Sequence, residues 1–196
     1  MTRKPLHQMQ VVKREEKEAV LIKFMLGEIA EGRVVLEGEW RIIALSMESP
    51  VLAAVRRVIG EFDEASRLAV KVVVVGRHAL TLADGFERVA SLAVRQAENL
   101  RLLDAHEQLV LGVKTSWTGD CMRRNPRERD AFEGFAADNP TLADWAAKAF
   151  ERIWRGARPI MVTESRHPAA ETAGVEDIVV AGEAKSEAVV AATSRH

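Results

Sequence analysis

The chain has 196 residues and a mass of 21.7 kDa, enough for one domain of ordinary size with little room for a second. Hydrophobic residues make up 47% and charged residues 29%, which excludes a wholly disordered or fibrous chain. The single cysteine, Cys121, excludes an internal disulfide framework, and no Cys/His spacing is typical of a zinc site. Because no apolar run resembles a signal-peptide core or a membrane span, we expect a cytoplasmic protein.

The charge is distributed unevenly along the chain. Residues 1–160 carry a formal charge of +2 and residues 161–196 carry −3, and neither value by itself indicates a polyanion binder. The composition of residues 161–196, polar and without aromatic residues, predicts a disordered tail with a short recognition segment at residues 176–181. We therefore expect three parts: an N-terminal helix within residues 1–33, a domain over 34–160, and a tail over 161–196.

The N-terminal part contains an amphipathic pattern. Apolar residues recur at helical spacing over residues 12–31, and Gly32 follows as a stop signal. The charged face mixes lysine, arginine and glutamate, whereas a membrane-surface helix would favour bases. We expect this helix to pack against the domain or against a partner chain.

The pattern changes to that of strands after residue 33. Residues 33–36 and 39–46 are short β-branched or aromatic runs separated by Gly38, which predicts two strands. A helix is predicted from Pro50 to about Phe62, with Ser49 as its N-cap. Residues 70–75 are almost continuously apolar, which is typical of a strand buried on both faces. Strand, helix and strand together predict a parallel pair joined by a right-handed crossover.

Six further elements are predicted before the tail. A helix is expected over residues 82–99, followed by strands at 100–103, 108–111 and 113–118. Asn125-Pro126 predicts the start of a helix to residue 138, and Asn139-Pro140 the start of another to about residue 155. In the last helix Trp145, Phe150 and Trp154 recur at helical spacings and are predicted to be core residues.

Residues 100–120 resemble the signature hairpin of the phospholipase D superfamily. In that family a strand carries a histidine with a lysine two residues later, and a second strand leads into Gly-Ser-x-x-Asn. His106 matches the histidine and Gly119 the glycine. Gln108 stands at the lysine position, and Asp120 and Met122 replace the serine and the asparagine. The resemblance covers roughly residues 34–158.

The resemblance implies an α/β fold, a mixed β-sheet flanked by helices on both faces in an α/β/α sandwich. It also implies a homodimer, since members with a single motif pair two chains so that two histidines meet across a two-fold axis. The hairpins that carry His106 would then lie near the interface.

The replaced residues bear on the family's reaction. There, a histidine attacks phosphorus, a second histidine protonates the leaving oxygen, and lysine and asparagine hold the phosphoryl oxygens. Without the lysine, and with the negative Asp120 close by, the site loses the charge that binds an anionic diester. The sequence therefore favours a non-catalytic binding or regulatory protein that keeps the scaffold.

An alternative is a phosphodiesterase or nuclease in which His106 works with a relocated phosphate site. Its anion-binding residues would be arginines that follow the motif, together with two residues at the end of the strand 70–75. The six candidates are Arg77, His78, Arg123, Arg124, Arg127 and Arg129. A solvated helix start with internal ion pairs is the competing interpretation of the four later arginines.

Few partners are indicated by residues alone. A protein partner would bind through residues 12–31 or the tail, and nucleic acid would bind through residues 123–129, with an affinity that falls steeply with salt. No Gly-rich phosphate loop occurs, so we expect no nucleotide cofactor, and no metal is implied.

Overall fold

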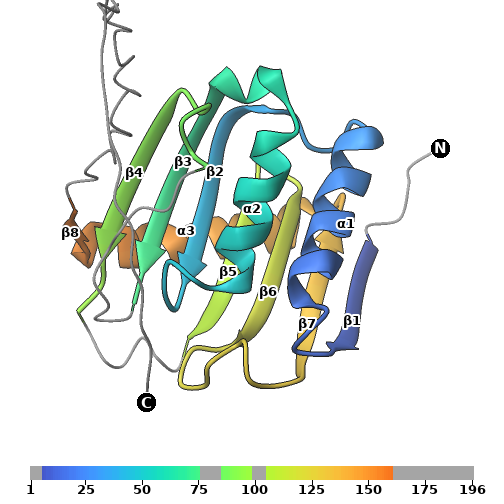
Figure 1. Ribbon diagram of the computed structural model, residues 1–196, viewed down its shortest axis with the longest axis vertical. Helices are drawn as coiled ribbons and strands as arrows, with labels where there is room; N and C mark the ends of the chain where they lie inside the picture. Colours follow the sequence, from blue (N-terminus) through green and yellow to red (C-terminus); the bar gives the residue numbers. More distant parts are fainter. Residues whose placement is uncertain (1–5, 76–84, 99–104, 161–196) are drawn as a thin grey trace, which may run out of the picture. The chain divides into compact units, whose positions relative to one another are not determined.

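A computed structural model describes residues 6–75, 85–98 and 105–160 of the chain. These residues form one eight-stranded sheet in the order β1-β7-β6-β5-β2-β3-β4-β8 (Figure 1). The strands are β1 (Leu6–Val12), β2 (Glu37–Ala44), β3 (Arg67–Val74), β4 (Ser91–Gln96), β5 (His106–Leu111), β6 (Thr115–Cys121), β7 (Ala131–Ala137) and β8 (Arg158–Pro159).

The sheet is mixed. Strands β2, β3 and β4 run parallel to one another, and every other neighbouring pair is antiparallel. The run of valines in β3 is buried, as expected for a strand between two parallel neighbours with helices on both faces. The predicted parallel pair β2–β3 is confirmed, with Ile43 opposite Val73.

Helices cover both faces of the sheet. In Figure 1, α1 (Lys17–Ala30) and α2 (Pro50–Gly60) lie in front of the sheet and α3 (Pro140–Gly156) crosses behind it. A short 3₁₀ helix, Asp63–Ser66, joins α2 to β3. A large core containing Trp40, Leu52 and Trp117 fills the α1/α2 side, and a smaller one around Ile43, Val73 and Phe150 fills the α3 side. The predicted mixed sheet between helical layers is confirmed.

Local signals at two helix starts agree with the structure. Pro50 and Pro140 each stand in the first turn, where a missing N–H costs nothing. The Asn139 side chain accepts a hydrogen bond from the Leu142 N–H at 3.1 Å and so caps α3. Ser49 occupies the N-cap position of α2, but its hydroxyl accepts from the Ser46 N–H instead.

Two predicted helices are wrong. Residues 91–96 of the expected helix 82–99 form β4, which hydrogen-bonds to β3, and residues 131–137 of the expected helix 126–138 form β7. Alanine-rich segments favour helices in isolation, but the sheet neighbours supply backbone partners that override this preference. Within β7, Phe132 is 70% exposed and the six other residues are buried, so the strand is covered on both faces over most of its length.

The N-terminal part also differs from the prediction. The helix starts at Lys17 rather than at residue 12, because Leu6–Val12 pairs with β7 as an edge strand. Residues 33–36 form bends and not a strand. The expected boundaries at residues 33 and 160 stay a prediction, although β1 and α1 share the sheet and the core of the residues that follow.

Other predictions have mixed outcomes. Strands 108–111 and 113–118 are confirmed as β5 and β6, although β6 begins at Thr115. Trp145 is 64% exposed, so its prediction as a core residue is wrong, whereas Phe150 is fully buried. The expected strand 100–103 and the tail 161–196 lie outside the described residues.

Candidate functional site

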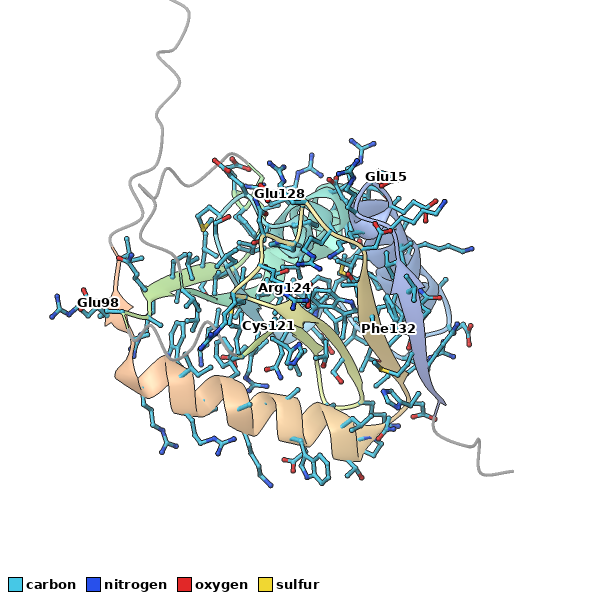
Figure 2. The ribbon with its side chains drawn as sticks, turned by 90° about the horizontal axis from the view of Figure 1, so that it is seen from below. Glu15, Glu98, Cys121, Arg124, Glu128 and Phe132 are labelled. Carbon is cyan, nitrogen blue, oxygen red and sulfur yellow. The ribbon has the colours of Figure 1, made fainter. Side chains whose placement is uncertain are left out.

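His106 lies at one edge of the sheet, where several strands have their ends. The parallel strands β2, β3 and β4 end there, and β5, antiparallel to β2, begins there with His106. Figure 2 looks onto this edge from below. Ligands of open α/β sheets bind outside the carboxyl ends of the parallel strands, so His106 stands where such a fold presents its functional groups.

His106 is exposed, and one of its ring nitrogens forms a hydrogen bond with the backbone. Its Nδ1 lies 2.8 Å from the backbone oxygen of Gly119 on β6, across a register shift between the two strands. A carbonyl oxygen only accepts, so Nδ1 carries the proton of this hydrogen bond. The neutral ring then has its lone pair on Nε2, which fixes the tautomer in the form that a nucleophile or base needs.

Gln108 stands two residues after His106, where the resemblance expects a lysine. Counted from Gly119 in Gly-Ser-x-x-Asn, the expected asparagine falls at residue 123, so the assignment of that position to Met122 is corrected to Arg123. Met122 is 1% exposed and packs in the smaller core. Gln108 has a buried side-chain oxygen without a hydrogen-bond partner, and its amide carries no positive charge.

Acidic groups lie close to His106 in the chain. Asp120 accepts a hydrogen bond from the Cys121 N–H at 2.7 Å, and Glu107 is buried on the opposite side of β5 from His106. Burial raises the pKa of Glu107, opposed by hydrogen bonds from the Leu45 N–H at 3.0 Å and from Ser49. Glu107 thus fixes the turn between β2 and α2, a role that the sequence analysis did not anticipate.

The arginines 123–129 lie in the loop between β6 and β7 and not at a helix start. The Asn125 side chain accepts from the Arg127 N–H at 3.1 Å and donates to Glu128 at 2.9 Å, so it closes a turn. The helix N-terminus that was expected to offer N–H groups to an anion is therefore absent from this loop. That expectation is corrected, because the following residues pair with β6 as β7.

The loop does not bring the four arginines to one point. Arg123 and Arg124 follow β6 after Met122, and the Arg124 N–H donates to the backbone oxygen of Cys121, the residue opposite His106 (Figure 2). Arg129 lies instead in a hollow with Lys13 and Arg14 beside three carboxylates. Arg127 lies toward α2, where burial of Arg56 and the charge of Arg127 both lower the pKa of Arg56. Arg77 and His78 lie outside the described residues.

A buried polar network joins α1 to the sheet on the α1/α2 side. The Lys17 ammonium lies 3.5 Å from Glu133 Oε1, and the Trp117 indole N–H donates to Glu133 Oε2 at 3.0 Å. All three residues are at most 2% exposed. Burial raises the pKa of Glu133 to about 7, although Trp117 and Lys17 oppose the shift. No periodicity separates Lys17 from the exposed Lys23 of the same helix, so the burial of Lys17 could not be predicted from local spacing.

Metal and membrane sites are not found in the part of the chain that the structure describes. No three His, Cys, Asp or Glu side chains there are grouped closely enough to hold a metal ion. None of the helices α1 to α3 is both long and apolar enough to span a bilayer.

Solved structures supply the comparisons for this chain, since no protein-family model and no curated protein matches it. Nuc, a phospholipase D family member from Salmonella typhimurium, is similar at a TM-score of 0.55 and 12% identity, over 80% of this chain and 99% of that one. NucT from Helicobacter pylori has a TM-score of 0.53 and 11% identity, and the match covers 80% of this chain and 100% of that one. The archaeal chromatin protein TrmBL2 has a TM-score of 0.50 and 9% identity, and the match covers 78% of this chain and 55% of that one.

These similarities show the fold. The described residues have a phospholipase D-like fold, as the hairpin at residues 100–120 predicts.

Proposed function

We propose that this protein is a non-catalytic binding or regulatory protein that keeps a phospholipase D-like scaffold without the reaction. The observation that supports this most directly is Gln108. It stands two residues after His106, where the resemblance expects the lysine that holds a phosphoryl oxygen, and its buried side-chain oxygen has no hydrogen-bond partner. A neutral amide does not supply the positive charge that binds a phosphate and stabilises its transition state.

The charges around His106 support the same proposal. Gln108 supplies no cation, and Asp120, beside the residue that pairs with His106, supplies a carboxyl group. A phosphodiester is an anion, so negative charge on Asp120 opposes its binding. Loss of a single stabilising donor costs about 100-fold to 1000-fold in rate, and here the lysine is replaced by Gln108.

The test is hydrolysis of a chromogenic phosphodiester, with a chelator present, by the wild-type protein and by His106→Ala. We expect no turnover above background in either protein. Arg57→Ala is the control, because Arg57 is also exposed but lies on α2. Hydrolysis by the wild type and Arg57→Ala that disappears in His106→Ala would overturn the proposal.

The second candidate is a phosphodiesterase or nuclease with a relocated phosphate site. It is favoured by the Nδ1–Gly119 hydrogen bond, which leaves Nε2 of His106 as the basic nitrogen, and by Arg123 and Arg124 at the start of the neighbouring loop. In that case Arg124→Gln lowers the rate as His106→Ala does, and Arg57→Gln on α2 leaves it unchanged.

A homodimer is part of the proposal. Pairing through the His106 hairpins brings the two copies of Cys121 near the two-fold axis, since Cys121 is opposite His106 in the sheet. Cys121 is the single cysteine of the chain, so a bis-maleimide would link two chains at that residue. A monomeric mass in light scattering and no cross-linked dimer would count against this arrangement.

A protein partner at residues 12–31 has only part of that segment available. Leu21 and Met25 of α1 are fully buried in the large core, so a partner would contact the opposite side, which includes Lys23. Lys23→Glu should weaken capture of such a partner while leaving the melting temperature within a few degrees.

A further inference from the structure

A basic stripe with one exposed tryptophan runs along the outer side of α3. It consists of Trp145, Lys148, Arg152 and Arg155. At about 100° per residue these four positions fall within an arc of about 80° on the helix. From the stripe we infer that α3 binds single-stranded nucleic acid, with Trp145 stacked on a base and the basic side chains against phosphates.

Trp145 is not needed for packing. The side of α3 that faces the sheet is formed by Ala143, Ala146 and Phe150, all of them buried. Trp145 is 64% exposed, and the other tryptophans, Trp40 and Trp117, are at most 2% exposed, while Trp154 stacks on Phe150. An indole exposed to solvent beside three basic side chains offers a stacking surface for nucleobases.

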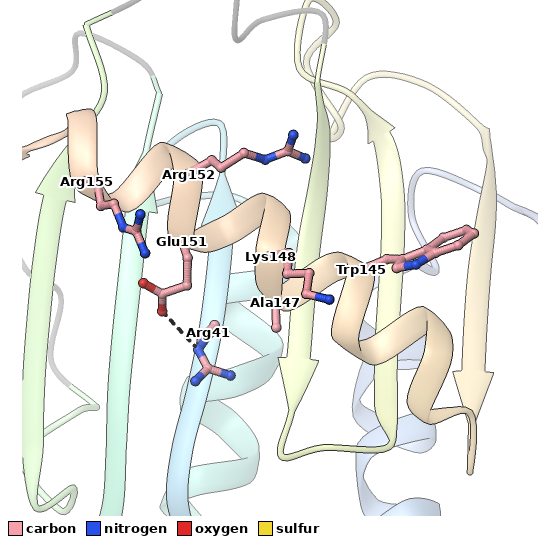
Figure 3. Close-up of a pocket in the computed structure, with 7 residues that line it drawn as sticks. All are labelled: Arg41, Trp145, Ala147, Lys148, Glu151, Arg152 and Arg155. Carbon is pink, nitrogen blue, oxygen red and sulfur yellow. Dashed lines mark ion pairs between the residues drawn. The ribbon is translucent and has the colours of Figure 1, made fainter.

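The basic side chains border one hollow of about 730 Å³ at the surface of α3 (Figure 3). Arg41 of β2 lines it with Lys148, Arg152 and Arg155, and Glu151 is the acid among the lining residues. Glu151 is engaged by Arg41 at 3.5 Å, as the dashed line in Figure 3 marks. The hollow therefore carries a net positive charge, which complements a phosphate backbone.

The charges on the stripe are available to a ligand. Within the described ranges, neither Arg152 nor Arg155 forms an ion pair, and both are exposed. Lys148 pairs with Asp144 at 2.7 Å, but this is an exposed i,i+4 pair of small net stability. A phosphate can therefore replace Asp144 at little cost.

A second, smaller hollow of about 220 Å³ adjoins Trp145 on the sheet side. Its polar lining includes His7, Ser116, Thr118 and Gln108, whose buried side-chain oxygen has no hydrogen-bond partner. Trp145 borders both hollows, so a base stacked on its ring meets polar groups on one side and the phosphates of the strand meet arginines on the other. The unpaired Gln108 oxygen suits an amino group on a base edge.

The geometry favours a single strand over the other polyanionic or membrane partners. Trp145 to Arg155 spans about 15 Å of helix, longer than one nucleotide, and stacking requires an unpaired base. In a duplex the bases stack on one another, so none is free to stack on Trp145. An acidic peptide would match the positive charge but would leave the indole without a nucleobase to stack on. A membrane-surface helix needs an apolar face, whereas the apolar side of α3 is buried against the sheet.

This inference deepens the proposed binding role and rests on it, and its surface shares Gln108 with the His106 site. The test is fluorescence anisotropy of a labelled oligothymidylate with the full-length protein over a series of salt concentrations. We expect Trp145→Ala to weaken binding by about 5-fold to 150-fold. R152E combined with R155E should weaken it further and reduce the slope of log K against log salt by about 0.7 for each phosphate that the variant no longer binds.

The matched controls are Trp145→Phe, which retains part of the stacking, and R57E combined with R67E, which removes two exposed arginines elsewhere. No binding at low salt, or binding that the α3 variants leave unchanged, would overturn the inference. Loss only in R124E combined with R127E would overturn it too and move the nucleic acid to the β6–β7 loop. Tighter binding of a duplex than of the single strand would also overturn the inference. None of these results depends on hydrolysis at His106.

Discussion

At the scale of residues, the least expected feature is a lysine and a glutamate buried together between α1 and the sheet. Lys17 and Glu133 are at most 2% exposed, and their charged atoms lie 3.5 Å apart. The Trp117 indole N–H donates a shorter hydrogen bond to Glu133, at 3.0 Å. Buried ion pairs add little net stability, but removal of one partner leaves an uncompensated charge. The pair therefore constrains how α1 docks on β6 and β7.

Glu133 makes stability depend on pH. Its pKa rises from an ordinary 4.5 to about 7 in the folded protein, so the folded state holds this proton more tightly than the unfolded chain. The free energy of unfolding should therefore fall as the pH rises from 4.5 to about 7, by about 3 kcal/mol from this group, and stay level above that. Urea unfolding at a series of pH values measures it.

Glu133→Gln should remove this part of the pH dependence, since the amide does not titrate. Glu61→Gln is the control, because Glu61 is an exposed carboxylate at the end of α2. A Glu133→Gln protein whose unfolding free energy keeps the wild-type slope between pH 4.5 and 7 would contradict the assignment.

Two glycines should respond oppositely to alanine. A Cβ on Gly119 would overlap the buried Trp117 ring, whereas one on Gly27 of α1 meets no atom. Gly119→Ala should lose about 1–3 kcal/mol through overpacking, and Gly27→Ala should gain up to about 1 kcal/mol through helix propensity. Chemical denaturation of both variants provides the comparison, and an unchanged Gly119→Ala would show that the Trp117 ring can move.

At the scale of elements, α3 is the helix whose start is best defined by sequence. The Asn139 side chain caps it through the Leu142 N–H, and Pro140 follows in the first turn. Asn139→Ala should cost about 1 kcal/mol, while Thr141→Ala, at an exposed position of the same turn, should change stability by less than about 0.5 kcal/mol. Equal losses in thermal melts of the two variants would contradict the role of the cap.

The strands β4 and β7 illustrate what local patterns miss. Both contain alanines and spaced apolar residues that also suit a helix, and both become strands because β3 and β6 present unpaired backbone groups beside them. The outer side of α3 is the reverse case, since its helix was predicted but the exposure of Trp145 was not. Spacing alone does not tell which side of a helix the sheet covers.

At the scale of the whole molecule, the N-terminal segment is part of the fold. β1 forms the edge of the sheet, and Val12, Leu21 and Met25 are buried in the large core. Deletion of residues 1–31 should therefore abolish cooperative unfolding, because each large apolar side chain removed costs about 2–5 kcal/mol. Deletion of residues 1–5 alone is the control, and a cooperative melt of the longer truncation would show that the remaining strands fold alone.

The sequence by itself determined the parallel β2–β3 unit, the hairpin that carries His106, the helix at Asn139-Pro140 and the phospholipase D-like scaffold. These features depend on short-range patterns: a buried valine run, capping residues and a motif of fixed spacing. Only the tertiary structure decided that β4 and β7 are strands, that Met122 is buried, that Lys17 meets Glu133 and that Trp145 faces solvent. Each of these depends on partners distant in the chain, and local spacing carries no information about them.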